Sequence, residues 1–321
     1  MIGTDERPLL PETMPCEAAQ AQLEAARLGD GLPLVAPTRR RLDAMLGGVK
    51  EPTACRAVMP PMFGELTALD VAYQCVLAGC VPGAVPLVLT AAMACTEPEF
   101  NLLGIATTTG SAAVALAVHG PVSVALGLNA ATGCLGPGCR ANATIGRALA
   151  LVLRNIAGAR PGTGDMATIG QPGKYTFCFA EHLDGPLPAL PSRRGLGGSA
   201  SAVTVLGVSG TAEVLPQHDR STPQSILDPL ALIMQASIAT SGAGQKTDPP
   251  DQVFLLPPEL ARQIVAAGWD LDHIARYLHG RGVVPSPAGV HPIVTGGAGI
   301  KMAYLPLWSG GSRPVTRVVV G

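Results

Sequence analysis

The chain carries little charge, and what it carries is balanced. Of its 321 residues, 14% are charged, with 22 Lys and Arg against 23 Asp and Glu. A nucleic-acid-binding protein usually presents a basic face, and a disordered chain is rich in charge and poor in apolar residues. This chain is 47% hydrophobic and has a formal net charge of -1. Its composition therefore predicts a globular protein that does not bind nucleic acid.

Aromatic residues are scarce too, at 3% of the chain, whereas Gly and Pro number 39 and 30. We find no internal repeat in the sequence. The many small residues allow helices and strands to pack closely, and they would equally allow copies of the chain to pack together in a homo-oligomer.

A continuous apolar segment long enough to span a membrane is missing. Residues 111–128 reach the required length, but His119, Gly120 and Pro121 interrupt them, so we expect two short buried elements joined by a turn. The first dozen residues have neither the basic start nor the apolar stretch of a secretory signal. We therefore expect a cytoplasmic protein with no membrane partner.

Cysteine is unevenly distributed, and no CxxC motif occurs. All eight cysteines lie within the first 178 residues. Without CxxC, neither a thioredoxin-type dithiol nor the usual zinc knuckle is present. Disulfides stabilise short secreted chains, and this chain is neither short nor evidently secreted, so reduced thiols are expected.

Apolar periodicity and turn residues predict an α/β fold with a mixed or mostly parallel sheet and flanking helices, arranged as one large domain or as two lobes. Helices are expected at residues 15–28, 39–46, 68–78, 84–94 and 226–239. Further helices are expected between the Gly136-Pro137-Gly138 turn and Gly158, after Pro257-Pro258, and from a cap at Asp270 or Asp272 to Leu278. Strands are expected at 112–118, 175–180, 202–208, 253–256 and 292–295. We predict a cysteine-containing lobe over 1–185, a linker rich in Pro, Gly and Ser over 186–201, and a second lobe over 202–321.

The glycine-rich turns do not match nucleotide-binding motifs. Tyr175 follows Gly173 and Lys174 where a P-loop needs Ser or Thr, and the turn at Gly297 and Gly299 lacks the third glycine of a dinucleotide fingerprint. Both segments are better explained as turns between a strand and its neighbour.

A better candidate for a ligand-binding site is the segment around the Gly136-Pro137-Gly138 turn, which leads into a helix. Backbone N–H groups at a helix N-terminus attract anions, and an arginine can hold a carboxylate or phosphate with two hydrogen bonds. The residues expected to bind substrate here are Arg140, Asn142 and Thr144, with Lys174 as a further anion partner. A capped helix with Arg140 paired to a structural carboxylate is the alternative.

Several residues could supply the chemistry. Cys80 lies in a loop directly after a helix. Cys178 lies on the predicted strand 175–180, between two phenylalanines, where its side chain could face a cleft. Glu181 follows that strand and is a candidate acid or base. Cys134 and Cys139 flank the glycine turn, where a thiolate is favoured; with His119 they could instead bind copper or zinc. Burial as small apolar residues is the alternative for each thiol.

Five segments also resemble a poorly characterised bacterial family associated with proteins that carry a UGSC or CGSC (selenocysteine or cysteine) motif. The segments are GDGLPLVAPT (29–38), LAGCVPGAVPLVLTAA (77–92), GPGCRANATIGRAL (136–149), GQPGKYTFCFAE (170–181) and TGGAG…SRPVTR (295–317). The chain itself has no CGSC. In the family pattern Cys80, Arg140, Asn142, Thr144, Lys174, Cys178 and Glu181 match, whereas Cys134 and Cys139 do not.

Together these patterns predict a cytoplasmic enzyme that uses cysteine chemistry on a small anionic substrate, a carboxylate or a phosphate. The reaction would be a C–S or C–N bond transformation or a hydrolysis, with no cofactor. Cys80 or Cys178 would be the nucleophile or thiol donor, and Glu181 would transfer protons. The alternatives are a copper or zinc protein and a non-catalytic partner subunit of a UGSC-type redox protein.

Overall fold

The computed structural model describes residues 7–197, 200–219, 221–241 and 249–320. The first six residues, on which the expectation of a missing secretory signal partly rests, lie outside these ranges, as do residues 198 and 199 of the predicted linker. Within them, no helix is long and apolar enough to cross a membrane.

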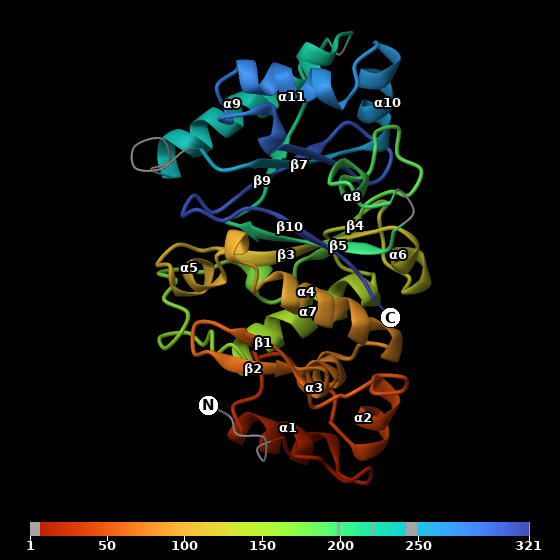
Figure 1. The fold of residues 1–321 in the computed structure, drawn as a ribbon, viewed down its shortest axis with the longest axis vertical. Coiled ribbons are helices and arrows are strands. Elements are labelled where there is room, and N and C mark those ends of the chain that lie inside the picture. Colours follow the sequence, from red (N-terminus) through yellow and green to blue (C-terminus); the bar gives the residue numbers. More distant parts are fainter. Residues whose placement is uncertain (1–6, 198–199, 220, 242–248, 321) are drawn as a thin grey trace.

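The α/β fold is confirmed, with helices flanking mixed sheets (Figure 1). The helices are α1 (Cys16–Ala25), α2 (Arg39–Met45), α3 (Ala68–Ala78), α4 (Val85–Ala94), α5 (Leu102–Thr107), α6 (Pro121–Ala125), α7 (Arg140–Asn155), α8 (Leu190–Arg193), α9 (Pro223–Ser241), α10 (Pro258–Ala266) and α11 (Leu271–Gly280). The strands are β1 (Cys55–Met59), β2 (Gly64–Thr67), β3 (Ala113–His119), β4 (Cys178–Ala180), β5 (Ala202–Val208), β6 (Ala212–Val214), β7 (Gln252–Leu256), β8 (Val290–Val294), β9 (Met302–Pro306) and β10 (Val315–Val318).

Two four-stranded sheets form the centre of the molecule. The first has the order β10-β5-β3-β4 and the second the order β6-β9-β7-β8. In each sheet the last pair named is parallel and the other two pairs are antiparallel. The two sheets thus share one topology, although the sequence shows no repeat.

The edge strands are exchanged between the two sheets. After β5 the chain crosses to the second sheet, where β6 pairs with β9. After β9 it crosses back, and β10 pairs with β5. The two crossings meet at a bridge between Val208 and Leu307. Segments on both sides of residues 186–201 therefore contribute strands to the first sheet.

The sheets pack face to face with helices outside them, which gives four main layers. Between the sheets lies an apolar layer that includes Ala117, Phe179, Leu206, Leu255 and Ile293. Figure 1 shows α3, α4 and α7 beneath the first sheet and α9, α10 and α11 above the second. Burial of the apolar faces of these helices supplies most of the stability of such a fold.

Sequence patterns located most of these elements and missed others. The helix predicted at 68–78 is α3, begun by a capping box of Thr67 and Asp70 and ended by Gly79 in the left-handed conformation. The strand predicted at 175–180 is shorter, because the Tyr175 amide donates to the Pro172 carbonyl and so cannot pair with a neighbouring strand. The short strands β1, β2, β6, β9 and β10 were not predicted.

Candidate functional site

A row of polar side chains crosses the first sheet near the carboxyl ends of its parallel strands. Glu181 follows β4, and its Oε2 lies 2.6 Å from Nδ1 of His119 on β3. Nε2 of His119 lies 2.8 Å from Oγ1 of Thr204 on β5, which is 2.8 Å from Oγ1 of Thr316 on β10. We call these four residues the polar row. Every strand of the sheet, or the residue directly after it, supplies one member.

Strand register places the row on the face that looks toward the second sheet. Thr204 is paired with Ala117 on one side and with Thr316 on the other. Ala117 belongs to the apolar layer between the sheets. Because side chains alternate along a strand, His119 points to that same face. The row is therefore buried at its inner end, where His119 is 1% exposed and Glu181 is 5% exposed.

Glu181 has three polar neighbours at the inner end of the row. Besides His119, its Oε2 accepts a hydrogen bond of 3.1 Å from the Leu190 amide at the start of α8. The guanidinium of Arg193, on the same helix, interacts electrostatically with this carboxylate. These neighbours place hydrogen-bond donors and a positive charge beside the buried carboxyl group.

The outer end of the row opens into a cavity of about 900 Å³. Thr316 lines it, together with residues of α8, α11, β8 and the segment before β10. The polar and charged residues of its wall are Glu97, Glu99, Arg193, Arg194, Asp251, Asp272, His291, Arg313, Thr316 and Arg317. We call this space the arginine cavity. Its volume is typical of a small-molecule site.

Arg193 is the arginine of this wall with the most unusual environment. Its Nη2 donates to the Pro292 carbonyl at 2.6 Å, whereas its buried Nε has no hydrogen-bond partner among the described residues. Burial lowers the pKa of Arg193 to about 10. A buried donor without a partner is costly, and a bound anion would satisfy it.

The same cavity wall holds a second His–carboxylate pair. Nε2 of His291 lies 2.8 Å from Oδ2 of Asp251. Burial lowers the pKa of His291, and the nearby Arg194 and Arg193 act in the same direction, against the opposite influence of Asp251. A lowered pKa favours the neutral form of the imidazole near neutral pH.

Three of the predicted substrate-binding residues lie together at the start of α7, whereas Lys174 lies in the turn before β4. Arg140 donates to the Gly79 carbonyl, and the Thr144 hydroxyl donates to the carbonyl of Arg140. Asn142 is buried and bonds to Asn129 and to the Cys134 carbonyl. Lys174 forms an ion pair of 2.6 Å with Asp165.

Cys80 is buried beneath the Arg140 end of α7. Its thiol donates to the Thr144 carbonyl at 3.2 Å. A hydrogen bond with the Cys75 thiol lowers the pKa of Cys80, helped by the Thr144 bond and the charge of Arg140 against the effect of burial. The same contact raises the pKa of Cys75.

Cys178 and Cys134 line a different cavity, of about 550 Å³, beside the Gly136-Pro137 turn. Burial raises the pKa of both thiols. Helix α7 packs tightly at Gly146 against the segment before β4. An added Cβ at Gly146 would lie only 2.4 Å from Oγ1 of Thr176. The cavity joins part of the predicted glycine turn to two predicted cysteines.

The alternative metal site is not assembled as a three-ligand group. In residues 7–197, 200–219, 221–241 and 249–320, no three His, Cys, Asp or Glu side chains gather in a way that could hold a metal ion. His119 uses both ring nitrogens in the polar row. Cys139 donates to the Gly127 carbonyl and to Asn142 Oδ1. A site built on thiols alone stays a prediction.

The sequence patterns singled out His119 and Glu181 separately, and the structure pairs them. They missed Thr204, Arg193 and Thr316. A sequence signal for an anion-binding wall was present, since the segment SRPVTR contains Arg313, Thr316 and Arg317. The two arginines of the predicted linker, Arg193 and Arg194, were a second signal.

Known proteins give no further guide to this site. Comparisons of the chain with protein-family models, curated proteins and solved structures found no match. Its chemistry is therefore inferred from the geometry of the polar row and the arginine cavity.

Proposed function

We propose that the chain is an enzyme that hydrolyses a small anionic substrate in the arginine cavity. The polar row supplies both the nucleophile, Thr316, and the general base, His119. The proposal keeps the substrate class expected from the sequence and assigns proton transfer to Glu181 and His119. The observation that carries it is the unbroken series of hydrogen bonds from buried Glu181 to Thr316 in the cavity wall.

The carboxylate of Glu181 fixes the direction of this series. An ionised carboxylate only accepts hydrogen bonds, so His119 donates from Nδ1 and accepts at Nε2. Thr204 then donates to His119 and accepts from Thr316. This order leaves the lone pairs of the Thr316 oxygen available to the cavity.

The same order allows a balanced proton transfer. When the Thr316 oxygen attacks the substrate, its proton moves to Thr204 and the Thr204 proton moves to Nε2 of His119. The resulting imidazolium is stabilised by Glu181, as in acid–His–hydroxyl triads. The proton returns to the leaving group, and water then releases Thr316 by the reverse route.

The arginines supply binding for a negatively charged group. Arg193 has a buried Nε available, and Arg313 is exposed at the cavity wall. Arg317 is 3.4 Å from Glu97, and both side chains are about one-third exposed, so this pair is weak. A carboxylate or phosphate of the substrate that displaces Glu97 from Arg317 gains charge-assisted hydrogen bonds from Arg317.

The test is a substrate screen followed by kinetics of variants. The purified chain is assayed against small carboxylic acids that carry an amide, ester or thioester bond, and against phosphate esters. For the best substrate, Glu181→Gln is expected to lower kcat by about 10²–10⁴-fold, the usual size of a general acid–base contribution. Thr316→Val removes the nucleophile and is expected to lower kcat at least as much.

Thr316→Ser is the matched control, because it keeps the hydroxyl and should retain most of the activity. A covalent adduct on Thr316, detected by mass spectrometry of the acid-quenched enzyme, is expected for a nucleophilic threonine. Full activity of both Glu181→Gln and Thr316→Val would refute the proposal.

Cysteine chemistry is a second candidate, favoured by the lowered pKa of Cys80. A low thiol pKa increases the nucleophilic thiolate fraction at neutral pH. Its test is alkylation of the folded chain, mapped to each cysteine. Cys80 reacting much faster than the other thiols, together with loss of turnover in Cys80→Ala, would move the nucleophile from Thr316 to Cys80.

A further inference from the structure

Three arginines gather around a third cavity, which shares no lining residue with the arginine cavity. Arg27 follows α1, Arg154 lies in the last turn of α7, and Arg160 begins the loop after it. All three line a cavity of about 400 Å³, together with Glu24, Gly29, Gly31, Pro161 and Thr163. This cavity takes no part in the proposed hydrolysis.

The three guanidinium groups are not neutralised by the protein. None of them forms an ion pair or a side-chain hydrogen bond with any residue that the structure describes. Glu24 is exposed at the same cavity, and it too has no ion pair within the described part of the chain. Like charges held together without a counter-ion repel each other, so this arrangement costs stability in the free protein.

Two details show that the charges act on one another and are partly removed from water. Burial lowers the pKa of Arg160, and the charges of Arg154 and Arg27 lower it further. Nε of Arg154 is buried and lacks a hydrogen-bond partner among the described residues. An unsatisfied guanidinium donor beside two further cations is what an anion site requires.

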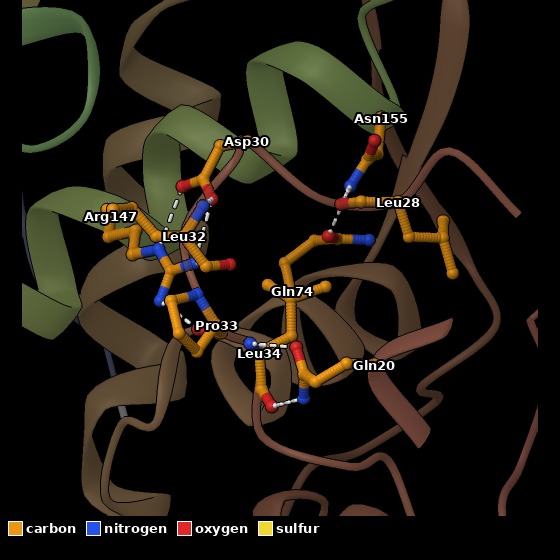
Figure 2. A network of polar contacts seen from close by, with 9 residues as sticks. All are labelled: Gln20, Leu28, Asp30, Leu32, Pro33, Leu34, Gln74, Arg147 and Asn155. Carbon is orange, nitrogen blue, oxygen red and sulfur yellow. Dashed lines mark hydrogen bonds and ion pairs between the residues drawn. The ribbon is translucent and has the colours of Figure 1, made fainter. Parts of the chain in front are cut away.

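Another part of the cavity wall is held in place by the contacts drawn in Figure 2. Gly29 and Gly31 belong to the loop that Arg147 fixes through both oxygens of Asp30 and through the carbonyls of Leu32 and Pro33. The Asn155 amide, next to Arg154 in the sequence, donates to the Leu28 carbonyl. The loop is thus ordered before any ligand binds, which lowers the entropic cost of binding.

We infer that the cavity formed by Arg27, Arg154 and Arg160 is a binding site for a phosphate-bearing ligand. Three guanidinium groups offer more donors than a single carboxylate can accept, and they match the several oxygens and the higher charge of a phosphate. Gly31 leaves open space at the wall, because an added Cβ there would meet nothing within 4 Å. The inference goes beyond the proposed hydrolysis and does not depend on it.

The experiment is calorimetric titration of the full chain with inorganic phosphate and with pyrophosphate, at constant ionic strength set with potassium chloride. We expect saturable binding that is at least about ten-fold weaker in Arg160→Gln and in Arg27→Gln, since a charge-assisted hydrogen bond contributes at least a factor of this size. Arg262→Gln, on the exposed face of α10, removes the same charge elsewhere and should bind as the wild type does.

A thermal measurement separates this site from the arginine cavity. Phosphate should raise the Tm of Arg193→Gln nearly as much as that of the wild type, and should raise the Tm of Arg160→Gln clearly less. Binding that is unchanged in both Arg160→Gln and Arg27→Gln, or lost only in Arg193→Gln, would overturn the inference. So would a Tm of the wild type that phosphate leaves unchanged relative to chloride.

Discussion

At the scale of single residues, His291 connects the arginine cavity to the stability of the fold. It is buried beside Asp251, and burial, with Arg194 and Arg193 nearby, lowers its pKa below the ordinary value of 6.5. The unfolded chain therefore binds a proton at His291 at a higher pH than the folded chain does. The contribution of His291 to the free energy of unfolding is therefore fully present above pH 6.5 and is lost as the pH falls below this value.

We predict that His291→Gln weakens this pH dependence. The free energy of unfolding of the wild type should fall between pH 6.5 and pH 5, with His291 contributing up to about 1.4 kcal/mol per pH unit. Urea unfolding at several pH values measures the slope. His218→Gln, at an exposed site, is the control and should keep the wild-type slope; equal slopes in all three proteins would contradict the assignment.

The residue scale also shows what the sequence could reveal about the site. His119 and Glu181 each end an apolar strand, and that position marks them as candidates. Thr204 lies inside an apolar strand, and its partner Thr316 is 112 residues away. Nothing local distinguishes such a threonine from one that only favours strand structure, so its role emerges only from the pairing of β5 with β10.

At the scale of elements, the loop before α2 depends on a single arginine of α7. Arg147 reaches both oxygens of Asp30 at 2.8 Å, and it also donates to two backbone carbonyls of the loop (Figure 2). Burial alone would raise the pKa of Asp30, but hydrogen bonds from Arg147 and the Leu32 amide lower it overall. The loop and the helix therefore behave as one unit.

Replacing Arg147 with lysine tests this connection. A lysine cannot donate to the two Asp30 oxygens and the two carbonyls in the planar arrangement that arginine offers. We expect a loss of about 1–2 kcal/mol in the free energy of unfolding, together with faster amide hydrogen exchange in residues 29–34. Urea unfolding and exchange measured by mass spectrometry provide the two readouts.

Arg262→Lys is the matched control for that substitution, because the side chain is exposed on α10. Exchange in residues 29–34 that is as slow in Arg147→Lys as in this control would show that the loop is held by other contacts, such as those between Gln20 and Leu34.

Local signals explain which elements could be predicted. The helix α3 has a polar cap at Thr67, an apolar stripe and a glycine stop, and each of these lies within a few residues of the others. The strand β8 was predicted although it contains Pro292, which is tolerated because β8 is at the edge of its sheet. The strands β9 and β10 also follow glycine turns, at residues 296–299 and 310–311, but partners distant in sequence determine their pairing.

At the scale of the whole molecule, each sheet is completed by an edge strand that the chain reaches by crossing over from the other sheet. β6 completes the second sheet and β10 completes the first. We predict that both sheets unfold in one cooperative transition. In pulse-labelling hydrogen exchange across a urea series, peptides that cover β3 and β7 should show the same midpoint. Two separate midpoints would mean that the sheets are independent despite the exchange.

The exchanged strands also have a consequence for how the chain is synthesised. β5 leaves the ribosome long before β10, since Thr204 and Thr316 are 112 residues apart. At roughly 5–20 residues per second, one edge of β5 stays unpaired for roughly ten seconds. Its sequence AVTVLGV is apolar and rich in β-branched residues, the kind of edge that pairs with other chains. The nascent chain must therefore be protected at β5, and the row that ends at Thr316 can form only after β10 has been made.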